Sequence, residues 1–275
     1  MLSSLVVKLQ PLESRTVLPY ALGRELRAWF YNLLSFKSSS FSDKIHNMKG
    51  SKPFTVSLLD GKRVDRGGRM ILDNKNLYRL RITGLTKEIF EVMSSSLFSV
   101  FSLNKTINFY DKQFLINKIC ISSEEHPLAG TINYEDLQDK RETKSFTLNF
   151  RTPSAFVYGD AVMALPVPYS VFRSYLFKWN SFSPSNFHME EDLLKVIEKS
   201  LFPSRYSLNT KILDMDKFRM VGFTGKCTFS VMGKVSSEEL KNILTLVRFS
   251  FYAGTGAKTT IGMGQTYPEF SAGQS

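Results

Sequence analysis

The sequence predicts an α+β protein with two tandem domains, each with its elements in the order β-α-β-β-α-β. Two observations predict this class: helical and alternating apolar patterns follow one another in that order, and the order occurs twice along 275 residues. A hydrophobic content of 43% is enough for a packed core. The order is that of a ferredoxin-like (RRM-like) fold. We expect domains at 1–125 and 144–275, joined by a polar connector at 126–143.

The first half contains one complete set of elements. Pro19 suits the first turn of a helix, and Asp60-Gly61 and Arg66-Gly67-Gly68 predict turns. The expected strands are Leu2–Leu9, Phe54–Leu59, Leu77–Thr83 and one or two within Thr106–Ile121, and the expected helices are Tyr20–Leu34, a short piece ending near Met48, and Lys87–Phe101.

The second half repeats the order with an extra helix. Tyr158-Gly159-Asp160 predicts a hairpin turn, Pro184 an interruption between helices, and Ser236–Glu239 a capping box. The expected strands are Lys144–Thr152 paired with Ala155–Met163, then Tyr206–Asp214, Phe218–Met232 and Gln265–Phe270, and the expected helices are Pro168–Trp179, Met189–Ser200 and Ser237–Tyr252.

The charge balance favours a polyanionic partner. The chain carries 36 Lys and Arg against 25 Asp and Glu, a formal net charge of +11. Neutralising phosphates releases condensed counterions, so this excess favours nucleic acid, although plain solubility is the alternative.

The cysteine and hydropathy patterns argue against two protein classes. Cys120 and Cys227 are the two cysteines, each in an apolar stretch, so a reducing compartment is expected rather than a disulfide framework. Lys8 breaks the first apolar run, which predicts a strand and not a signal peptide. No run approaches the roughly 18 apolar residues of a membrane span. We expect a cytoplasmic protein.

A glycine-rich segment, Gly254–Gly264, follows the last predicted helix and holds four glycines, one lysine and three threonines. The backbone N–H groups of a glycine-rich loop, together with a lysine, suit the binding of phosphate. Ala257 replaces the glycine that precedes the lysine of a Walker A loop, and a helix stands where a dinucleotide fingerprint requires a strand. We therefore predict a clamp on a nucleic-acid backbone, with a packing turn as the alternative.

Three histidines occur, His46, His126 and His188, and none has metal-ligand spacing to another histidine or to a cysteine. No metal and no cofactor is expected. A nuclease without metal would use the RNA's own 2′-OH, a histidine for proton transfer and a lysine for the phosphorane charge. His46 lies among lysines and a glycine, which suits this chemistry, and an ordinary surface histidine is the alternative. His126 and His188 are expected to have no catalytic role.

Six short segments carry one further pattern. The first half contains Leu-Pro-Tyr, then Tyr31-Asn, then His46-x-x-Lys-Gly-x-Lys52-Pro-Phe-Thr-x-Ser; the second contains Phe146–Phe156, Pro166–Trp179 and Phe251–Gln265. Together they resemble the CRISPR-repeat-processing endoribonucleases of the repeat-associated (RAMP) superfamily. The resemblance spans nearly the whole chain, and the glycine motif combined with the histidine–lysine segment is specific.

The resemblance implies two ferredoxin-like domains and metal-independent cleavage of precursor CRISPR RNA within each repeat. The products would end in a 5′-OH and in a 2′,3′-cyclic or 3′ phosphate. A Tyr-His-Lys set of the family matches Tyr31, His46 and Lys52. His46 would be the general acid or base and Lys52 would meet the phosphorane charge, with Lys49 as its substitute. Tyr31 would position or transfer a proton, unless it only packs the first helix.

The same resemblance implies that the glycine-rich segment holds the RNA backbone. The residues concerned are Gly254, Gly256, Lys258, Thr259, Thr260, Gly262 and Gly264, with Lys49 and Arg248 as further contacts. Arg248 is alternatively only a charge near a helix end. Arg15, Arg24, Arg27, Arg173 and Lys178 are further cations that the sequence does not rank above surface charge. Recognition by hairpin shape and backbone is expected, because no RRM signature is found.

The expected partner is precursor CRISPR RNA, and subunits of a CRISPR effector complex and a second copy of the chain are further candidates. The main alternative function is a non-catalytic RNA-binding subunit of such a complex, and a basic protein-interaction domain is the third. The presence of His46 in its matching context favours the nuclease, a component of antiviral defence.

Overall fold

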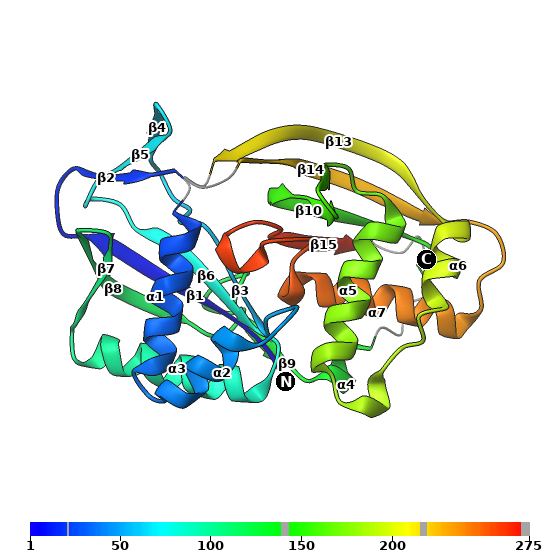
Figure 1. The fold of residues 1–275 in the computed structure, drawn as a ribbon, viewed down its shortest axis with the longest axis horizontal. Coiled ribbons are helices and arrows are strands. Elements are labelled where there is room, and N and C mark those ends of the chain that lie inside the picture. The colour runs from blue at the N-terminus through cyan, green and yellow to red at the C-terminus, as the bar shows by residue number, and fades with distance from the viewer. Residues whose placement is uncertain (21, 139–142, 215–218, 271–275) are drawn as a thin grey trace. The chain divides into compact units, whose positions relative to one another are not determined.

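The computed structural model describes residues 1–20, 22–138, 143–214 and 219–270 (Figure 1). These residues form two compact units. The first comprises residues 1–131 together with 260–262, and the second comprises the other described residues. Each unit contains an antiparallel sheet with helices packed on it. The two-domain α+β prediction is thereby confirmed.

The first unit has its five main strands in the spatial order β3-β6-β1-β8-β7, with β9 pairing to β1. Side chains that alternate along β1, Leu5, Val7 and Leu9, are fully buried in one core with helices α1 and α3. The bounds are β1 Leu2–Pro11, α1 Gly23–Ser35, α2 Ser39–Asn47, β3 Phe54–Val56, β6 Tyr78–Gly84, α3 Lys87–Ser102, β7 Thr106–Phe109, β8 Lys112–Cys120 and β9 Gly130–Ile132.

A small three-stranded sheet was not predicted. Strands β2 (Thr16–Pro19), β5 (Arg69–Leu72) and β4 (Val64–Arg66) pair in the order β2-β5-β4. Gly67 and Gly68, both with positive φ, form the expected turn, here between β4 and β5. The prediction that Pro19 begins a helix is wrong: Pro19 pairs with Arg69 at the end of β2, where its missing N–H is tolerated. Helix α1 begins only at Gly23.

The second unit has a four-stranded sheet in the order β13-β14-β10-β15. The bounds are α4 Tyr134–Leu137, β10 Ser145–Ser154, β11 Phe156–Tyr158, β12 Ala161–Met163, α5 Pro168–Phe182, η1 Ser185–Phe187, α6 Leu193–Ser200, β13 Leu201–Asp214, β14 Arg219–Val231, α7 Ser237–Ala253, η2 Thr259–Ile261 and β15 Thr266–Phe270. Its main strands, numbered along the chain, stand in the spatial order 2-3-1-4. The first unit has the same order in β3-β6-β1-β8, with β7 added at the edge, as tandem ferredoxin-like folds require.

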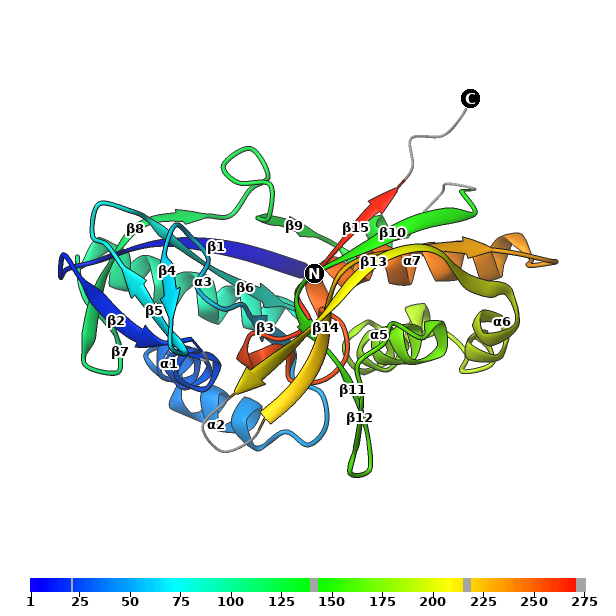
Figure 2. The ribbon, with the colours of Figure 1, turned by 90° about the horizontal axis from the view of Figure 1, so that it is seen from above.

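Two predicted details of the second unit are wrong. Residues 144–152 do not pair with 155–163: β10 pairs with β14 and β15, while β11 and β12 form their own hairpin around Gly159 (Figure 2). The chain diverts after Ser154 because the carbonyl of Ala155 accepts a hydrogen bond from the N–H of Ala257. The helix predicted from Met189 begins at Leu193, because Asn180 hydrogen-bonds both the N–H and the carbonyl of Met189.

Several other expectations are confirmed. Ser236 and Glu239 form the capping box of α7. Cys120 and Cys227 are buried free thiols. The predicted connector contains β9 and α4, and its boundaries stay a prediction. Among the described residues, none of the helices combines the length and apolar character needed to cross a membrane.

Candidate active site and glycine-rich loop

His46 lies at the exposed carboxyl end of α2, beside α1. The Oγ of Ser38 accepts a hydrogen bond from the N–H of Phe41 and starts this short helix, and Phe41 and Ile45 bury its inner face. The outer face then presents His46 to the ring of Tyr31 on α1. The two rings meet edge to face with centroids 5.0 Å apart. Two residues separated by fifteen positions in sequence are thus brought into contact.

Tyr31 is held in place on both sides. Its ring also contacts Phe54 of β3 edge to face, with centroids 5.6 Å apart. Its backbone carbonyl accepts a hydrogen bond from the Oγ of Ser42 on α2 at 2.9 Å, which ties α2 to α1. Burial raises the pKa of the Tyr31 phenol, and the positive charge of Arg27 opposes this. The phenol is therefore neutral at physiological pH and able to donate its proton in a hydrogen bond.

Lys52 closes the carboxyl end of α2. Its Nζ donates to the carbonyls of Ile45 at 2.9 Å, His46 at 2.8 Å and Met48. These carbonyls have no partner within the helix, so the lysine supplies the missing donors. Partial burial, and the nearby charge of Arg27, lower the pKa of Lys52. The structure thus brings Tyr31, His46 and Lys52 together, and their catalytic roles stay a prediction.

Lys49 lies in the turn that follows α2. Its side chain is exposed, and Gly50 beside it has a positive φ of 75°. The turn leads back to Lys52 and into β3. Lys49 is accordingly placed where a polyanion could reach it, close in sequence to the three clustered residues.

The four glycines of the segment 254–264 all have positive φ, between 61° and 95°. A Cβ on Gly256 would lie 2.3 Å from the carbonyl oxygen of Ala155, and one on Gly264 would lie 2.2 Å from that of Thr255. These positions admit only glycine, because both the backbone angle and the space forbid a side chain. Packing of the loop therefore explains the glycines without reference to a ligand.

Several of the backbone donors in this loop already have partners. The N–H groups of Thr255, Ala257 and Gly264 donate to carbonyls within the second unit at 2.7–2.9 Å. The N–H of Gly256 donates to the Oγ of Ser174. Lys258, with a positive φ of 59°, is exposed, and Thr260 is half-buried. Those two side chains are the parts of the loop best placed to meet RNA, a role that stays a prediction.

One face of α5 holds the loop. Tyr175 hydrogen-bonds Thr255, and Thr255 hydrogen-bonds Thr266. Lys178 is 7% exposed, and its Nζ lies 2.7 Å from the carbonyl oxygen of Ala253 and 3.3 Å from the Oγ1 of Thr259. Thr259 is thus buried against a lysine. Burial lowers the pKa of Lys178 to about 7.

The tip of the glycine-rich segment belongs to the first unit. Gly262 forms a parallel bridge with Ser57, and a Cβ on Gly23, at the start of α1, would lie 1.9 Å from the carbonyl oxygen of Ile261. Gly23 is therefore required where α1 begins beside residues 260–262. Sequence reasoning missed Gly23, because a glycine in a helical pattern carries no sign of its contacts.

Arg248 lies on α7 and points to the end of α4. Its Nη1 donates to the carbonyl of Leu137 at 2.8 Å and lies 3.3–3.4 Å from those of Asp136 and Gln138. This gives Arg248 a structural role at a helix end, and RNA binding by it stays a prediction. The sequence could not indicate this partner, because α4 is a single unpredicted turn.

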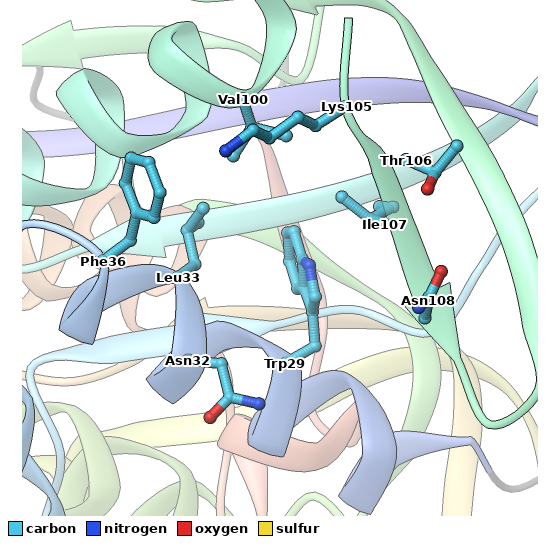
Figure 3. Close-up of a pocket in the computed structure, with 9 residues that line it drawn as sticks. All are labelled: Trp29, Asn32, Leu33, Phe36, Val100, Lys105, Thr106, Ile107 and Asn108. Carbon is cyan, nitrogen blue, oxygen red and sulfur yellow. The ribbon is translucent and has the colours of Figure 1, made fainter. Parts of the chain in front are cut away.

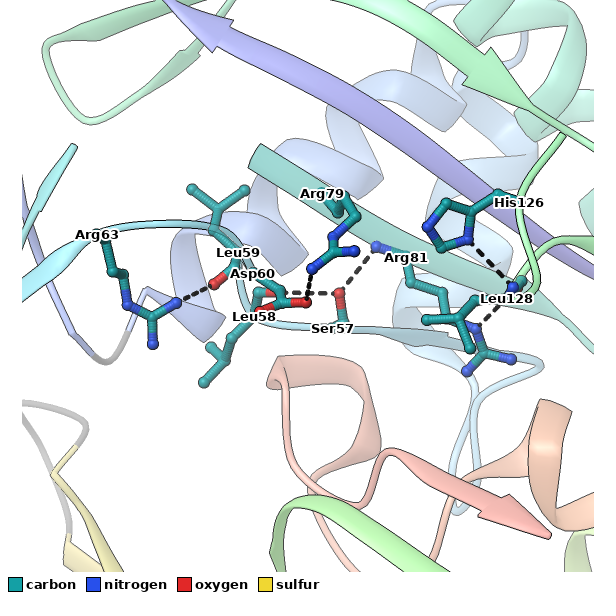
Figure 4. Close-up of polar contacts among 9 residues, drawn as sticks. All are labelled: Ser57, Leu58, Leu59, Asp60, Arg63, Arg79, Arg81, His126 and Leu128. Atoms are coloured by element: carbon teal, nitrogen blue, oxygen red, sulfur yellow. Dashed lines mark hydrogen bonds and ion pairs between the residues drawn. The ribbon is translucent and has the colours of Figure 1, made fainter. Parts of the chain in front are cut away.

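A polar network on the first unit joins β6 to the segment after β8 (Figure 4). Arg81 is 4% exposed, and its Nε donates to the Oγ of Ser4 and to the carbonyl of Leu128. The Nδ1 of His126 accepts a hydrogen bond from the N–H of Leu128. Burial, followed by nearby positive charges, lowers the pKa of His126. His126 is thus a buried residue of a loop, and its lack of a catalytic role stays a prediction.

A cavity of about 270 Å³ lies between α1, α3 and β7 (Figure 3). Trp29, Leu33, Val100 and Ile107 are among its lining residues, and the Nζ of Lys105 lies 5.4 Å from the ring centroid of Phe36 at its edge. None of the residues predicted to act on RNA lines it. Among the described residues, no group of three or more His, Cys, Asp or Glu is arranged to hold a metal ion.

Two family models match the chain. Residues 1–139 match the model described as the CRISPR Cas6 N-terminal domain, and residues 148–266 match that of the CRISPR-associated endoribonuclease Cas6. Among curated proteins, Cas6 of Streptococcus thermophilus is 31% identical over 149 residues, which are 54% of this chain and 60% of that protein. Cas6 of Mycobacterium tuberculosis is 28% identical over 145 residues, 52% of this chain and 44% of that protein. These matches span about half the length of the curated relatives.

The fold has relatives among solved structures. A product complex of a Thermus thermophilus Cas6 superposes with a TM-score of 0.82 and 26% identity, covering 98% of this chain and 100% of the other. A Cas6-related protein of Pyrococcus furiosus gives a TM-score of 0.63 at 14% identity, covering 98% of each chain, which shows a shared fold alone.

Proposed function

Because the chain belongs to the Cas6 family of CRISPR-associated endoribonucleases, we propose that it cleaves precursor CRISPR RNA within its repeats and needs no metal ion. The contact between His46 and Tyr31 at the exposed end of α2 carries the proposal. An imidazole transfers protons near neutral pH, and RNA supplies its own nucleophile. The product and substrate-mimic complexes solved for Cas6 proteins support RNA as the ligand.

The reaction is a transesterification. The 2′-oxygen forms a bond to phosphorus, the bond from phosphorus to the 5′-oxygen breaks, and one proton moves from the 2′-OH to a base while another reaches the 5′-oxygen. The ends are a 5′-OH and a 2′,3′-cyclic phosphate, which water opens to a 3′ phosphate. We assign His46 to proton transfer and Tyr31 to positioning or donation as a neutral phenol. Lys52 belongs to the same site through its bond to the carbonyl of His46.

The remaining assignments complete the proposal. Lys49 of the first unit contacts the RNA backbone. In the second unit the glycine-rich loop presents the exposed Lys258 for a second backbone contact. Subunits of an effector complex and a second copy of the chain are proposed partners. The protein acts in the cytoplasm, which the two free, buried cysteines support.

The test is a cleavage assay with labelled repeat RNA from the host's own array in excess EDTA. Wild type is compared with His46→Ala and with His188→Ala, which removes a histidine outside α2. A second RNA carries one 2′-deoxy nucleotide at the scissile position. We expect wild type and His188→Ala to cleave, and cleavage to disappear with His46→Ala and with the deoxy RNA.

A different result would contradict each part of the proposal. Loss of cleavage in EDTA that returns with Mg²⁺ overturns metal independence. Binding without cleavage makes the chain a passive RNA-holding subunit. Normal cleavage by His46→Ala, with the deoxy RNA inert, keeps 2′-OH attack and removes His46 from it.

A further inference from the structure

The ammonium group of Lys52 has no hydrogen-bond donor left for a phosphate. An ammonium carries three N–H donors. Three backbone carbonyls at the end of α2, those of Ile45, His46 and Met48, accept from Lys52. Releasing one to reach a ligand would leave a helix carbonyl without a partner. Lys52 therefore caps the carboxyl end of α2 and holds the backbone of His46 in place.

The proposed reaction still needs a cation. Attack by the 2′-oxygen creates a phosphorane whose non-bridging oxygens carry extra negative charge. Fixed donors aimed at that charge are usually the largest contribution to such catalysis. A guanidinium suits two non-bridging oxygens, because its N–H groups form a planar fork. The group must lie beside the Tyr31–His46 pair and keep its donors unused.

Arg27 satisfies both requirements. It precedes Tyr31 by four residues on α1, which places the two side chains on one face of the helix, with their Cβ atoms roughly 6 Å apart. Its positive charge acts to lower the pKa of both Tyr31 and Lys52, in agreement with this placement on α1. Arg27 is half-buried, and within the part of the chain that the structure describes it has neither a hydrogen-bond acceptor nor an ion-pair partner.

The neighbouring cations fit the role less well. Lys44, on α2, faces Glu88, with Nζ and a carboxylate oxygen 3.7 Å apart. Lys49 lies in the exposed turn beyond His46. Neither shares a helix face with Tyr31, whereas Arg27 does.

We propose that Arg27 binds the scissile phosphate and balances the charge of the phosphorane, whereas Lys52 is a positioning residue that fixes the end of α2 and with it His46. The inference rests on the proposed function and assigns its cation. Arg27 binds the phosphate oxygens through its N–H donors and takes no part in proton transfer. The protons move between the RNA oxygens and the groups already named, so the reaction stays balanced.

The experiment measures the single-turnover cleavage rate at saturating repeat RNA, together with the melting temperature. The variants are Arg27→Met, Arg27→Lys and Lys52→Met, with Arg66→Met as a control that removes an exposed arginine from β4. We expect Arg27→Met to cleave about 10²–10³-fold more slowly at an unchanged melting temperature. Arg27→Lys should recover part of the rate, and Arg66→Met should match wild type.

Replacing one phosphate oxygen of the RNA with sulfur distinguishes a residue that contacts the phosphate from one that only positions His46. RNA with a single phosphorothioate of defined stereochemistry at the scissile position slows an enzyme that holds the replaced oxygen. We expect one isomer to slow wild type and Lys52→Met by the same factor, and Arg27→Met by a smaller factor. Lys52→Met should also melt at a lower temperature, because α2 loses its cap.

Three results would overturn the inference or its premise. Cleavage by Arg27→Met within about threefold of wild type, while His46→Ala is inactive, overturns the role of Arg27 alone. A sulfur effect that disappears in Lys52→Met and persists in Arg27→Met gives the phosphate to Lys52. Wild type that binds repeat RNA without cleaving it overturns the proposed function, and with it this inference.

Discussion

Lys178→Met tests a lysine that is buried in the second unit. Lys178 is 7% exposed, and its Nζ contacts the carbonyl oxygens of Ala253 and Gly254 and the Oγ1 of Thr259. No carboxylate among the described residues pairs with it. The folded protein therefore holds this lysine partly as a neutral amine, with a pKa of about 7 against an ordinary value of 10.5. Methionine keeps the length and apolar stem of the side chain and removes the titrating group.

Whether the free energy of unfolding rises or falls with pH depends on which state, folded or unfolded, binds the proton of Lys178. Unfolded Lys178 stays protonated up to pH 10.5, whereas the folded chain loses that proton above about pH 7. Between these values the unfolded state binds more protons, so the free energy of unfolding rises with pH, by at most about 1.4 kcal/mol per unit. From pH 7 to pH 9, wild type should gain about 2 kcal/mol relative to Lys178→Met. This is an upper limit, because the carbonyls at the end of α7 favour the charged form.

The assay is urea unfolding of wild type and Lys178→Met at pH 7, 8 and 9, followed by circular dichroism. Comparing the two proteins cancels the titration of every other group. Lys234→Met, which removes an exposed lysine of the same unit, shows the effect of losing one charge alone. A difference between wild type and Lys178→Met that stays constant from pH 7 to pH 9 refutes the reasoning, since it would mean that Lys178 stays charged in the folded chain.

Two further predictions concern the glycine-rich loop. Gly256→Ala should lower the free energy of unfolding by about 2 kcal/mol or more, because its Cβ would meet the carbonyl of Ala155. The control Gly159→Ala has a similar φ but open space around its Cβ, so it should lower the free energy of unfolding by only about 1 kcal/mol. Equal losses in urea unfolding would argue against the contact with Ala155. Lys258→Ala should reduce the slope of log K against log salt for repeat RNA by about one, while Lys52→Met leaves it unchanged; an unaltered slope for Lys258→Ala removes it from the phosphate contacts.

The periodic apolar patterns predicted the helices and strands. They did not predict contacts between residues that lie far apart in the sequence. Helices α3 and α7 follow their apolar spacing closely, because that spacing is the cause of their burial. Pro19 was misplaced because its role depends on a strand fifty residues away. The meeting of Tyr31 and His46 was expected only from a family resemblance, since no local spacing places two residues of different helices in contact.

Three cations that the sequence offered for catalysis or for RNA contact bind carbonyl groups at helix ends. Lys52 binds the last carbonyls of α2, Lys178 those of α7, and Arg248 those of α4. The carboxyl end of a helix is negative and short of donors, so a long cationic side chain satisfies it from a distance. A net charge of +11 therefore overstates the charge available to a polyanion. For that reason Arg27, which shares a helix face with Tyr31, is a stronger candidate for phosphate than these three cations.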